Sequence, residues 1–75
     1  MIFNRIKKII VEQLDLDEKD IEKNTSFKEL KVDSLELFQI IIDIEEEFDV
    51  QIEDAESIKT VQDAVKIVEE KINIK

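Results

Sequence analysis

Apolar side chains recur with the period of an α-helix in three separate segments of the chain, and polar connections separate these segments. The first stripe predicts a helix over residues 2–14, the second predicts a helix over 34–48, and the third predicts a last helix that begins after Thr60. No segment alternates apolar and polar residues over a useful length, so no strand is expected. The interrupted pattern also excludes a long coiled coil, and the chain is predicted to be all-α.

Two of the expected helices begin with a side chain that can cap them. Asp33 can accept a hydrogen bond at the start of the second helix, and Glu36, three residues later, can return one. Thr60 and Asp63 have the same spacing at the start of the last helix. Residues 54–58 leave room only for a short helix or turn. The expected fold is a small four-helix bundle with three main helices, one short helix and a long first loop.

The long first loop, from about residue 15 to residue 32, is polar with isolated apolar residues. A loop of this length needs anchors if it is to be ordered. Ile21, Phe27 and Leu30 are the residues that can supply them, and a short turn is expected near residues 26–30.

The helix expected over 34–48 is the most apolar of the three. Residues at helical spacing in a small bundle are needed first of all for its core. One predicted stripe consists of Leu37, Phe38, Ile41, Ile44 and Phe48, and it is widened by Leu35, Ile40 and Ile42.

The composition excludes most catalytic chemistry. The 75 residues contain no Cys, His, Gly, Pro, Trp or Tyr. Without Cys or His there is no disulfide or thiolate nucleophile, and neither the usual general base nor the usual transition-metal ligand. Asp15, Asp17 and Asp20 lack the spacing, the Gly and the bidentate Glu of an EF-hand loop. We expect a single domain over residues 1–75 that is not an enzyme and holds no metal.

The hydrophobic runs are short. None is longer than three residues, which excludes a membrane-spanning helix and the apolar core of a signal peptide. A cytoplasmic monomer is expected.

Negative charge is concentrated in one third of the chain. The formal net charge is −9, and residues 33–58 contain ten acids and no Lys or Arg. Such a charge argues against nucleic acid or an anionic membrane as a partner. Two interpretations of this acidic third stay open: a docking surface for basic proteins, or a solvated helix face that keeps a small protein soluble.

Ser34 stands at the start of the second expected helix. The first backbone N–H groups of a helix lack intrahelical partners and the helix dipole is positive there, so the position suits a phosphate ester. No His is present to make Ser34 a nucleophile. Another enzyme would therefore have to modify it, and the alternative is a serine that only starts the helix.

Three short motifs lie around and after this serine: Val32-Asp33-Ser34-Leu35-Glu36, then Ile41-Ile42-Asp43-Ile44-Glu45-Glu46-Glu47-Phe48-Asp49-Val50, and then Ile58-Lys59-Thr60-Val61-Gln62-Asp63-Ala64. Together they resemble the acyl carrier proteins, whose Asp-Ser-Leu motif carries a 4′-phosphopantetheine arm on the serine. The resemblance covers about residues 27–65. It implies that Ser34 is the attachment site, loaded from coenzyme A by a phosphopantetheinyl transferase, and it implies the same four-helix bundle that the periodicity predicts.

The resemblance further implies a carrier that holds acyl chains as thioesters and presents them to enzymes of type-II fatty acid biosynthesis with basic docking surfaces. The implied recognition residues are Asp33, Leu35, Glu36, Glu45 and Glu46. The implied acyl pocket lies near Ile40, Ile44, Ile52 and Ile58.

Departures from the family pattern leave the pathway open. Lys31 stands where most relatives have Gly, the loop before Ser34 is one residue shorter than in the commonest fatty-acid carriers, and the segment between Ile52 and Thr60 is also short. A carrier dedicated to a polyketide, aminoacyl or other acyl group is therefore a second hypothesis. A purely structural acidic module that binds basic proteins and carries no cofactor is a third.

Overall fold

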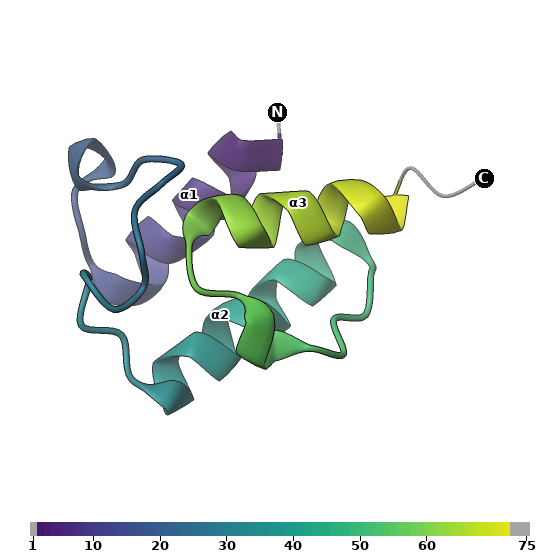
Figure 1. Cartoon of the computed structure of the whole chain (residues 1–75). Coiled ribbons are helices and arrows are strands. Elements are labelled where there is room, and N and C mark those ends of the chain that lie inside the picture. The colour runs from purple at the N-terminus through teal and green to yellow at the C-terminus, as the bar shows by residue number, and fades with distance from the viewer. Residues whose placement is uncertain (1, 73–75) are drawn as a thin grey trace.

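The computed structural model describes residues 2–72, and these residues form a helical fold (Figure 1). The elements in chain order are α1 (Ile2–Leu14), a 3-10 turn η1 (Glu18–Asp20), α2 (Ser34–Phe48), a 3-10 turn η2 (Ala55–Ser57) and α3 (Val61–Ile72). The helices predicted over 2–14 and 34–48 are confirmed at both ends. Within residues 2–72 the only β-type pairing is an isolated bridge between Ser26 and Thr60.

The short fourth element of the expected bundle is a single 3-10 turn, η2, so the bundle has three α-helices. The other turn, η1, was not predicted. Asp17 caps this turn, and its Oδ1 accepts the backbone N–H of Lys19 at 3.5 Å. A turn of three residues is too short to show a helical period, which is why the sequence pattern did not indicate it.

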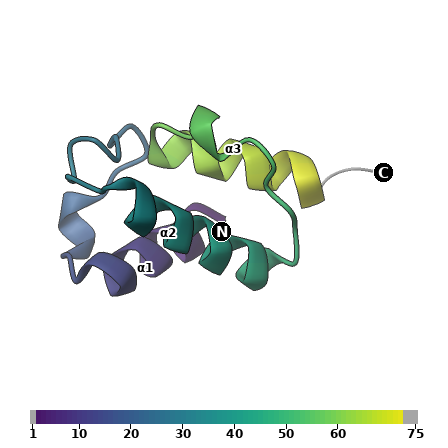
Figure 2. The same cartoon turned by 90° about the horizontal axis from the view of Figure 1, so that it is seen from below.

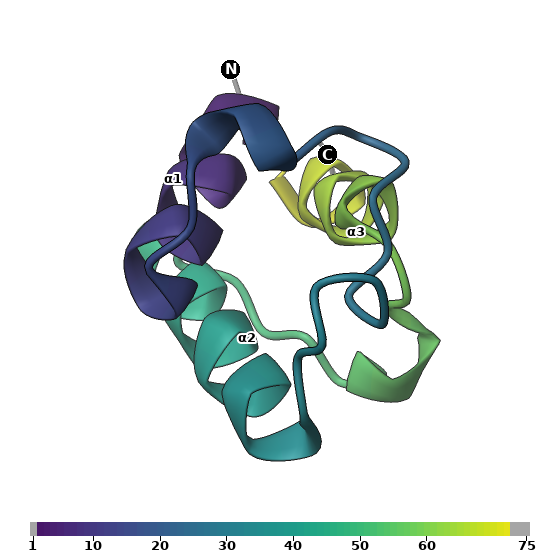
Figure 3. The same ribbon diagram turned by 90° about the vertical axis from the view of Figure 1, so that its left-hand side faces the viewer.

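Helix α1 is the centre of the packing and makes the most extensive helix–helix contacts, with α3 and with α2. Figure 2 shows α1 next to α2. In Figures 1 and 3 the connection that contains η2 passes between α2 and α3. The two helices that flank this connection are therefore held together largely through α1.

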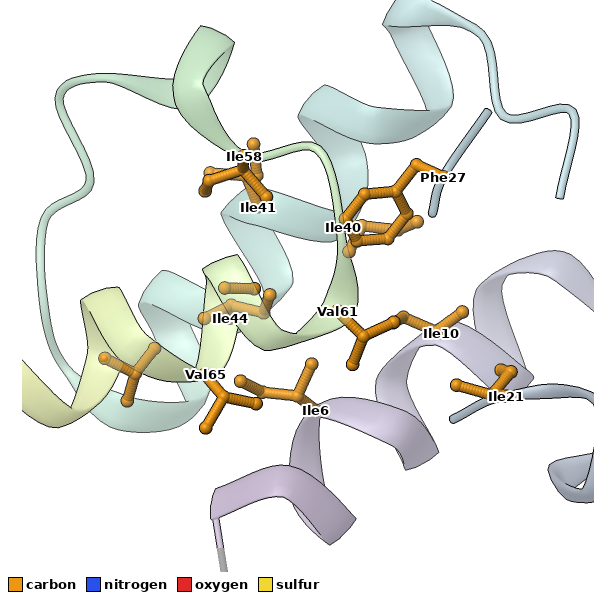
Figure 4. Packing of buried hydrophobic residues seen from close by; sticks show 12 residues of the cluster. Ile6, Ile10, Ile21, Phe27, Ile40, Ile41, Ile44, Ile58, Val61 and Val65 are labelled. Carbon is orange, nitrogen blue, oxygen red and sulfur yellow. The ribbon is translucent and has the colours of Figure 1, made fainter. Parts of the chain in front are cut away.

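The core is aliphatic with one aromatic ring (Figure 4). No polar or charged residue in the described part of the chain is buried. The buried residues are Ile6 and Ile10 of α1, Ile40, Ile41 and Ile44 of α2, Val61, Ala64, Val65 and Val68 of α3, and Ile21, Phe27 and Ile58 of the connections.

Phe38 was predicted to belong to the core stripe of α2, and this prediction was wrong. Its side chain is 54% exposed, and Leu35 and Ile42 are 79% and 45% exposed. Each residue turns a helix by about 100°, so these three positions point away from the face that buries Ile40 and Ile44. The helix has more apolar residues than one face can hold, and the surplus lies outside.

The long loop between α1 and α2 is anchored as predicted. Ile21 and Phe27 are buried, and Leu30 packs against the core. The loop also pairs with the start of α3: the Phe27 N–H donates to Lys59 O at 3.0 Å, and the Val61 N–H donates to Thr25 O at 3.0 Å. This backbone pairing fixes the loop that leads to α2.

The predicted cap of α3 is confirmed. The Asp63 N–H donates to Thr60 Oγ1 at 3.1 Å, and Asp63 Oδ2 accepts the N–H groups of Lys59 and Thr60 at 3.0 and 3.1 Å. The pKa of Asp63 lies below its usual value, chiefly because the Lys59 backbone N–H donates to the ionised carboxylate.

Two aspartates end helices in a chain that has no glycine. Asp15 follows α1 with φ 56°, and Asp49 follows α2 with φ 55°. Asp tolerates this left-handed conformation better than most residues with a Cβ. The positions that glycine most often occupies after a helix are thus filled by acids.

Candidate functional site

Ser34 is the first residue of α2, and the residue before it caps the helix. Asp33 Oδ1 accepts the Glu36 N–H at 2.9 Å, and Glu36 Oε1 accepts the Asp33 N–H at 3.3 Å. The predicted capping box is therefore confirmed. These bonds hold the start of the helix without using the hydroxyl of Ser34, which lies exposed at the surface.

The turn that leads to Ser34 is also closed by reciprocal bonds. The Glu29 N–H donates to Ser26 Oγ, and the Ser26 N–H donates to Glu29 Oε1, both at 3.0 Å. The turn ends at Lys31, whose φ is 60°. A residue with a Cβ is unfavourable in this left-handed conformation. Glycine has no Cβ, so the position favours glycine. Lys31 therefore adopts the conformation that a glycine would take, at an energetic cost.

The hydroxyl groups of the three serines in the sequence have different surroundings. Ser26 Oγ accepts the Glu29 N–H at 3.0 Å, and Ser57 Oγ donates to Asp54 O at 2.8 Å. Both hydroxyls thus stabilise turns. Ser34 is the serine whose hydroxyl has no role in its own cap, and it is the one that the sequence motif selects.

An exposed apolar stripe begins beside Ser34. Leu35, Phe38 and Ile42 follow one another at i, i+3 and i+7 along the outer face of α2. The sequence predicted Leu35 as a contact beside the serine, whereas Phe38 and Ile42 were predicted only as part of the apolar stripe of α2. Their i, i+3, i+7 spacing shows that the three residues share one face of the helix, but it does not show that this face is exposed.

The acids predicted to recognise partners differ in what they contact. Asp33 and Glu36 form the cap of α2. Glu45 is half-buried and its Oε2 accepts the Ile52 N–H at 2.7 Å. Glu46 is exposed and forms no ion pair with the residues that the structure describes. Within residues 2–72, Glu46 is the one of these four carboxylates that makes no hydrogen bond or ion pair.

A surface hollow of about 420 Å³ lies between α1 and α2, lined by Ile9, Glu12, Gln13, Asp43, Glu46 and Glu47. At its edge Arg5 pairs with Glu47, and the Arg5 guanidinium lies 4.6 Å from the centre of the Phe48 ring. Glu12, which the sequence places outside the acidic third, therefore contributes to the same acidic surface.

The four isoleucines predicted to line an acyl pocket lie in one region of the core. Ile40 and Ile44 are fully buried and Ile58 is 2% exposed (Figure 4). Ile52 is partly buried and packs against the same cluster. In this conformation they pack against protein and contribute to the stability of the fold.

None of the described helices has the length and apolar character needed to cross a membrane. Residues 2–72 contain no cluster of three or more Asp, Glu, His or Cys side chains arranged to hold a metal ion.

Comparison with known proteins identifies the class to which this site belongs. A family model described as "Phosphopantetheine attachment site" matches residues 4–69. An acyl carrier protein of Streptococcus thermophilus (strain CNRZ 1066) is 49% identical over 70 residues, which cover 93% of this chain and 95% of the relative. An acyl carrier protein of Lactococcus lactis subsp. cremoris (strain MG1363) is 48% identical over 68 residues, which cover 91% and 93% of the two chains.

The chain belongs to the acyl carrier proteins, a family with a phosphopantetheine attachment site. Members of this family carry acyl groups on covalent 4′-phosphopantetheine and are not enzymes. The family implies interaction with a phosphopantetheinyl transferase and with enzymes of fatty acid synthesis.

Proposed function

We propose that Ser34 carries the 4′-phosphopantetheine arm, and that the protein holds acyl chains on this arm as thioesters for type-II fatty acid biosynthesis in the cytoplasm. The observation that supports the site most directly is the exposed Ser34 at the capped start of α2. The other two serines, Ser26 and Ser57, stabilise turns through their hydroxyls.

The start of α2 fits the phosphate of such an arm. The cap uses the N–H groups of Asp33 and Glu36, so it leaves those of Ser34 and Leu35 for other partners at the positive end of the helix dipole. When bound, the arm would supply a flexible thiol for thioester formation. Ser34 supplies the oxygen that anchors it, and because the chain has no Cys or His, another enzyme must catalyse the attachment.

The outer face of α2 supports a docking role. An exposed apolar stripe (Leu35, Phe38 and Ile42) starts next to Ser34. It is followed on the same helix by Glu46, whose carboxylate forms no ion pair within residues 2–72. A partner enzyme with a basic rim and an apolar patch would fit this face, and steering by opposite charge would speed encounters without requiring high affinity. A tethered arm then delivers its thioester by local search.

The experiment is incubation with coenzyme A and a phosphopantetheinyl transferase, followed by intact-mass measurement. The wild type should gain the mass of one phosphopantetheine, and Ser34→Ala should gain nothing. Ser26→Ala and Ser57→Ala are the controls and should be loaded like the wild type. The Ser34→Ala variant should remain folded because Asp33 retains the cap. Loading that persists in Ser34→Ala would contradict the assignment, and an unloaded wild type would favour the purely structural acidic module.

A dedicated acyl pathway is the second candidate, and the short connection after α2 favours it. Between Ile52 and Thr60 this connection forms only one 3-10 turn. The mass of the acyl group that is thioester-linked to the protein in its native cell decides between the two: fatty acyl intermediates of graded length support fatty acid synthesis, and a single other acyl type supports the dedicated pathway.

A further inference from the structure

The segment that joins α2 to α3 begins with hydrogen bonds to one residue of α2, Glu45. Asp49 ends the helix in a left-handed conformation (φ 55°, ψ 51°), and its N–H donates to Glu45 O. The Val50 N–H donates to the same oxygen at 3.1 Å. The side chain of Glu45 then reaches further along the chain, where its Oε2 accepts the Ile52 N–H at 2.7 Å.

The far end of this segment is held at Lys59 and Thr60 by Phe27 and Asp63, but residues 53–58 have few bonds to hold them in place. The turn η2 has no side-chain cap, and its hydrogen bonds are local, from Ser57 N and Ile58 N to Asp54 O and Ala55 O. Among the residues that the structure describes, the Glu45–Ile52 bond is the only hydrogen bond from residues 51–58 to any residue outside them. The attachment of the segment to α2 otherwise depends on apolar packing.

The Glu45–Ile52 bond is important because the segment that it holds packs against the core. Ile58 is buried together with Ile40 and Ile44 of α2, and Ile52 and Ala55 pack against the same cluster. The segment therefore contributes Ile58, Ile52 and Ala55 to one side of the core (Figure 4 shows Ile58). An acyl chain that entered the cluster between this segment and α2 would have to separate the two.

We propose that Glu45 is a positioning residue that holds residues 50–58 against α2 and thereby keeps a bound acyl chain enclosed. This inference rests on the proposed function in so far as it concerns an acyl chain. It assigns Glu45 a role different from the partner recognition that the sequence resemblance implies. A carboxylate that accepts a backbone N–H makes a charge-assisted bond, which is stronger than a bond between neutral groups. The half-buried position of Glu45 limits the competition from water.

The neighbouring residue provides a matched control. Glu46 is an acid on the same turn of α2, but it is exposed and has no ion-pair partner within residues 2–72. Glu45→Ala and Glu46→Ala therefore remove the same charge from adjacent positions, and only the first removes the bond to Ile52. Glu45→Gln keeps an oxygen acceptor of the same shape and tests whether the bond itself matters.

The first measurement is amide hydrogen exchange in the unloaded protein. Loss of a hydrogen bond to a charged acceptor should speed exchange at Ile52 by about tenfold to a hundredfold in Glu45→Ala. Glu46→Ala should match the wild type, and Glu45→Gln should lie between the wild type and Glu45→Ala. Equal exchange at Ile52 in Glu45→Ala and Glu46→Ala would overturn the proposal.

The second measurement is cleavage by hydroxylamine of an octanoyl thioester on the loaded protein. Glu45→Ala should raise the cleavage rate towards that of free octanoyl-phosphopantetheine, and Glu46→Ala should leave it unchanged. Faster exchange at Ile52 without faster cleavage would overturn the enclosing role. A wild type that cannot be loaded would instead refute the proposed function and the enclosing role with it, whereas the exchange at Ile52 would still decide whether Glu45 holds the segment.

Discussion

Replacing Lys31 by glycine is expected to stabilise the protein. Lys31 has φ 60°, and this left-handed conformation costs a residue with a Cβ roughly 1–2 kcal/mol. Glycine removes that cost but makes the unfolded chain more flexible, which opposes folding by about 0.5–1 kcal/mol. The expected net gain is about 0.5–1 kcal/mol, which corresponds to a rise in Tm of about 2–8 °C for a domain of this size.

The assay is thermal and urea unfolding of Lys31→Gly beside Lys31→Ala. Alanine keeps a Cβ and removes the same positive charge, so the difference between the two variants isolates the backbone conformation. Lys28→Gly is a second control in the same turn, and it should lower stability because Lys28 does not have a positive φ. A Lys31→Gly variant no more stable than Lys31→Ala would refute the reasoning.

Three further predictions follow from charge. Moderate salt should raise Tm near neutral pH by screening repulsion among the ten acids of residues 33–58, and a flat or falling Tm would contradict this. Because the folded-state pKa of Asp63 lies below 3.8, its contribution to stability is complete above about pH 5 and disappears as the pH falls through the folded pKa. Asp63→Asn should therefore flatten the dependence of the unfolding free energy on pH below about pH 4, and an unchanged slope there would argue against it. Glu46→Lys should slow arm attachment by a basic transferase more than Glu69→Lys does, with little change in stability; equal slowing would mean that only net charge matters.

The helices and their caps could be predicted from the sequence because their causes are local. The start of α2 follows from Asp33 and Glu36, and the helix ends at Asp49 in a left-handed conformation. Ser34 could be singled out for the same reason, since a motif and a helix start are both contained in a few consecutive residues.

The placement of Phe38 and Ile42 required the structure. Helical spacing shows that apolar residues share a face, but it does not show which of two apolar faces meets α1. The pairing of residues 25–27 with residues 59–61 was also beyond sequence reasoning, because these bonds join segments that are distant along the chain. The bond from Glu45 to Ile52 spans a helix end and a loop, and no local pattern indicates it.

The abundance of acids has a structural cause that neither docking nor solubility supplies. This chain has no glycine and no proline to close its turns, and acidic side chains accept backbone N–H groups at many of its helix and turn boundaries instead. The acids that do so are Asp17, Glu29, Asp33, Glu36, Glu45 and Asp63. Three of these six lie in the acidic third, so these carboxylates have a structural role in addition to any part in docking. Charge reversals at those three would alter the fold as well as docking, and Glu46 is therefore the position on α2 at which the docking hypothesis can be tested alone.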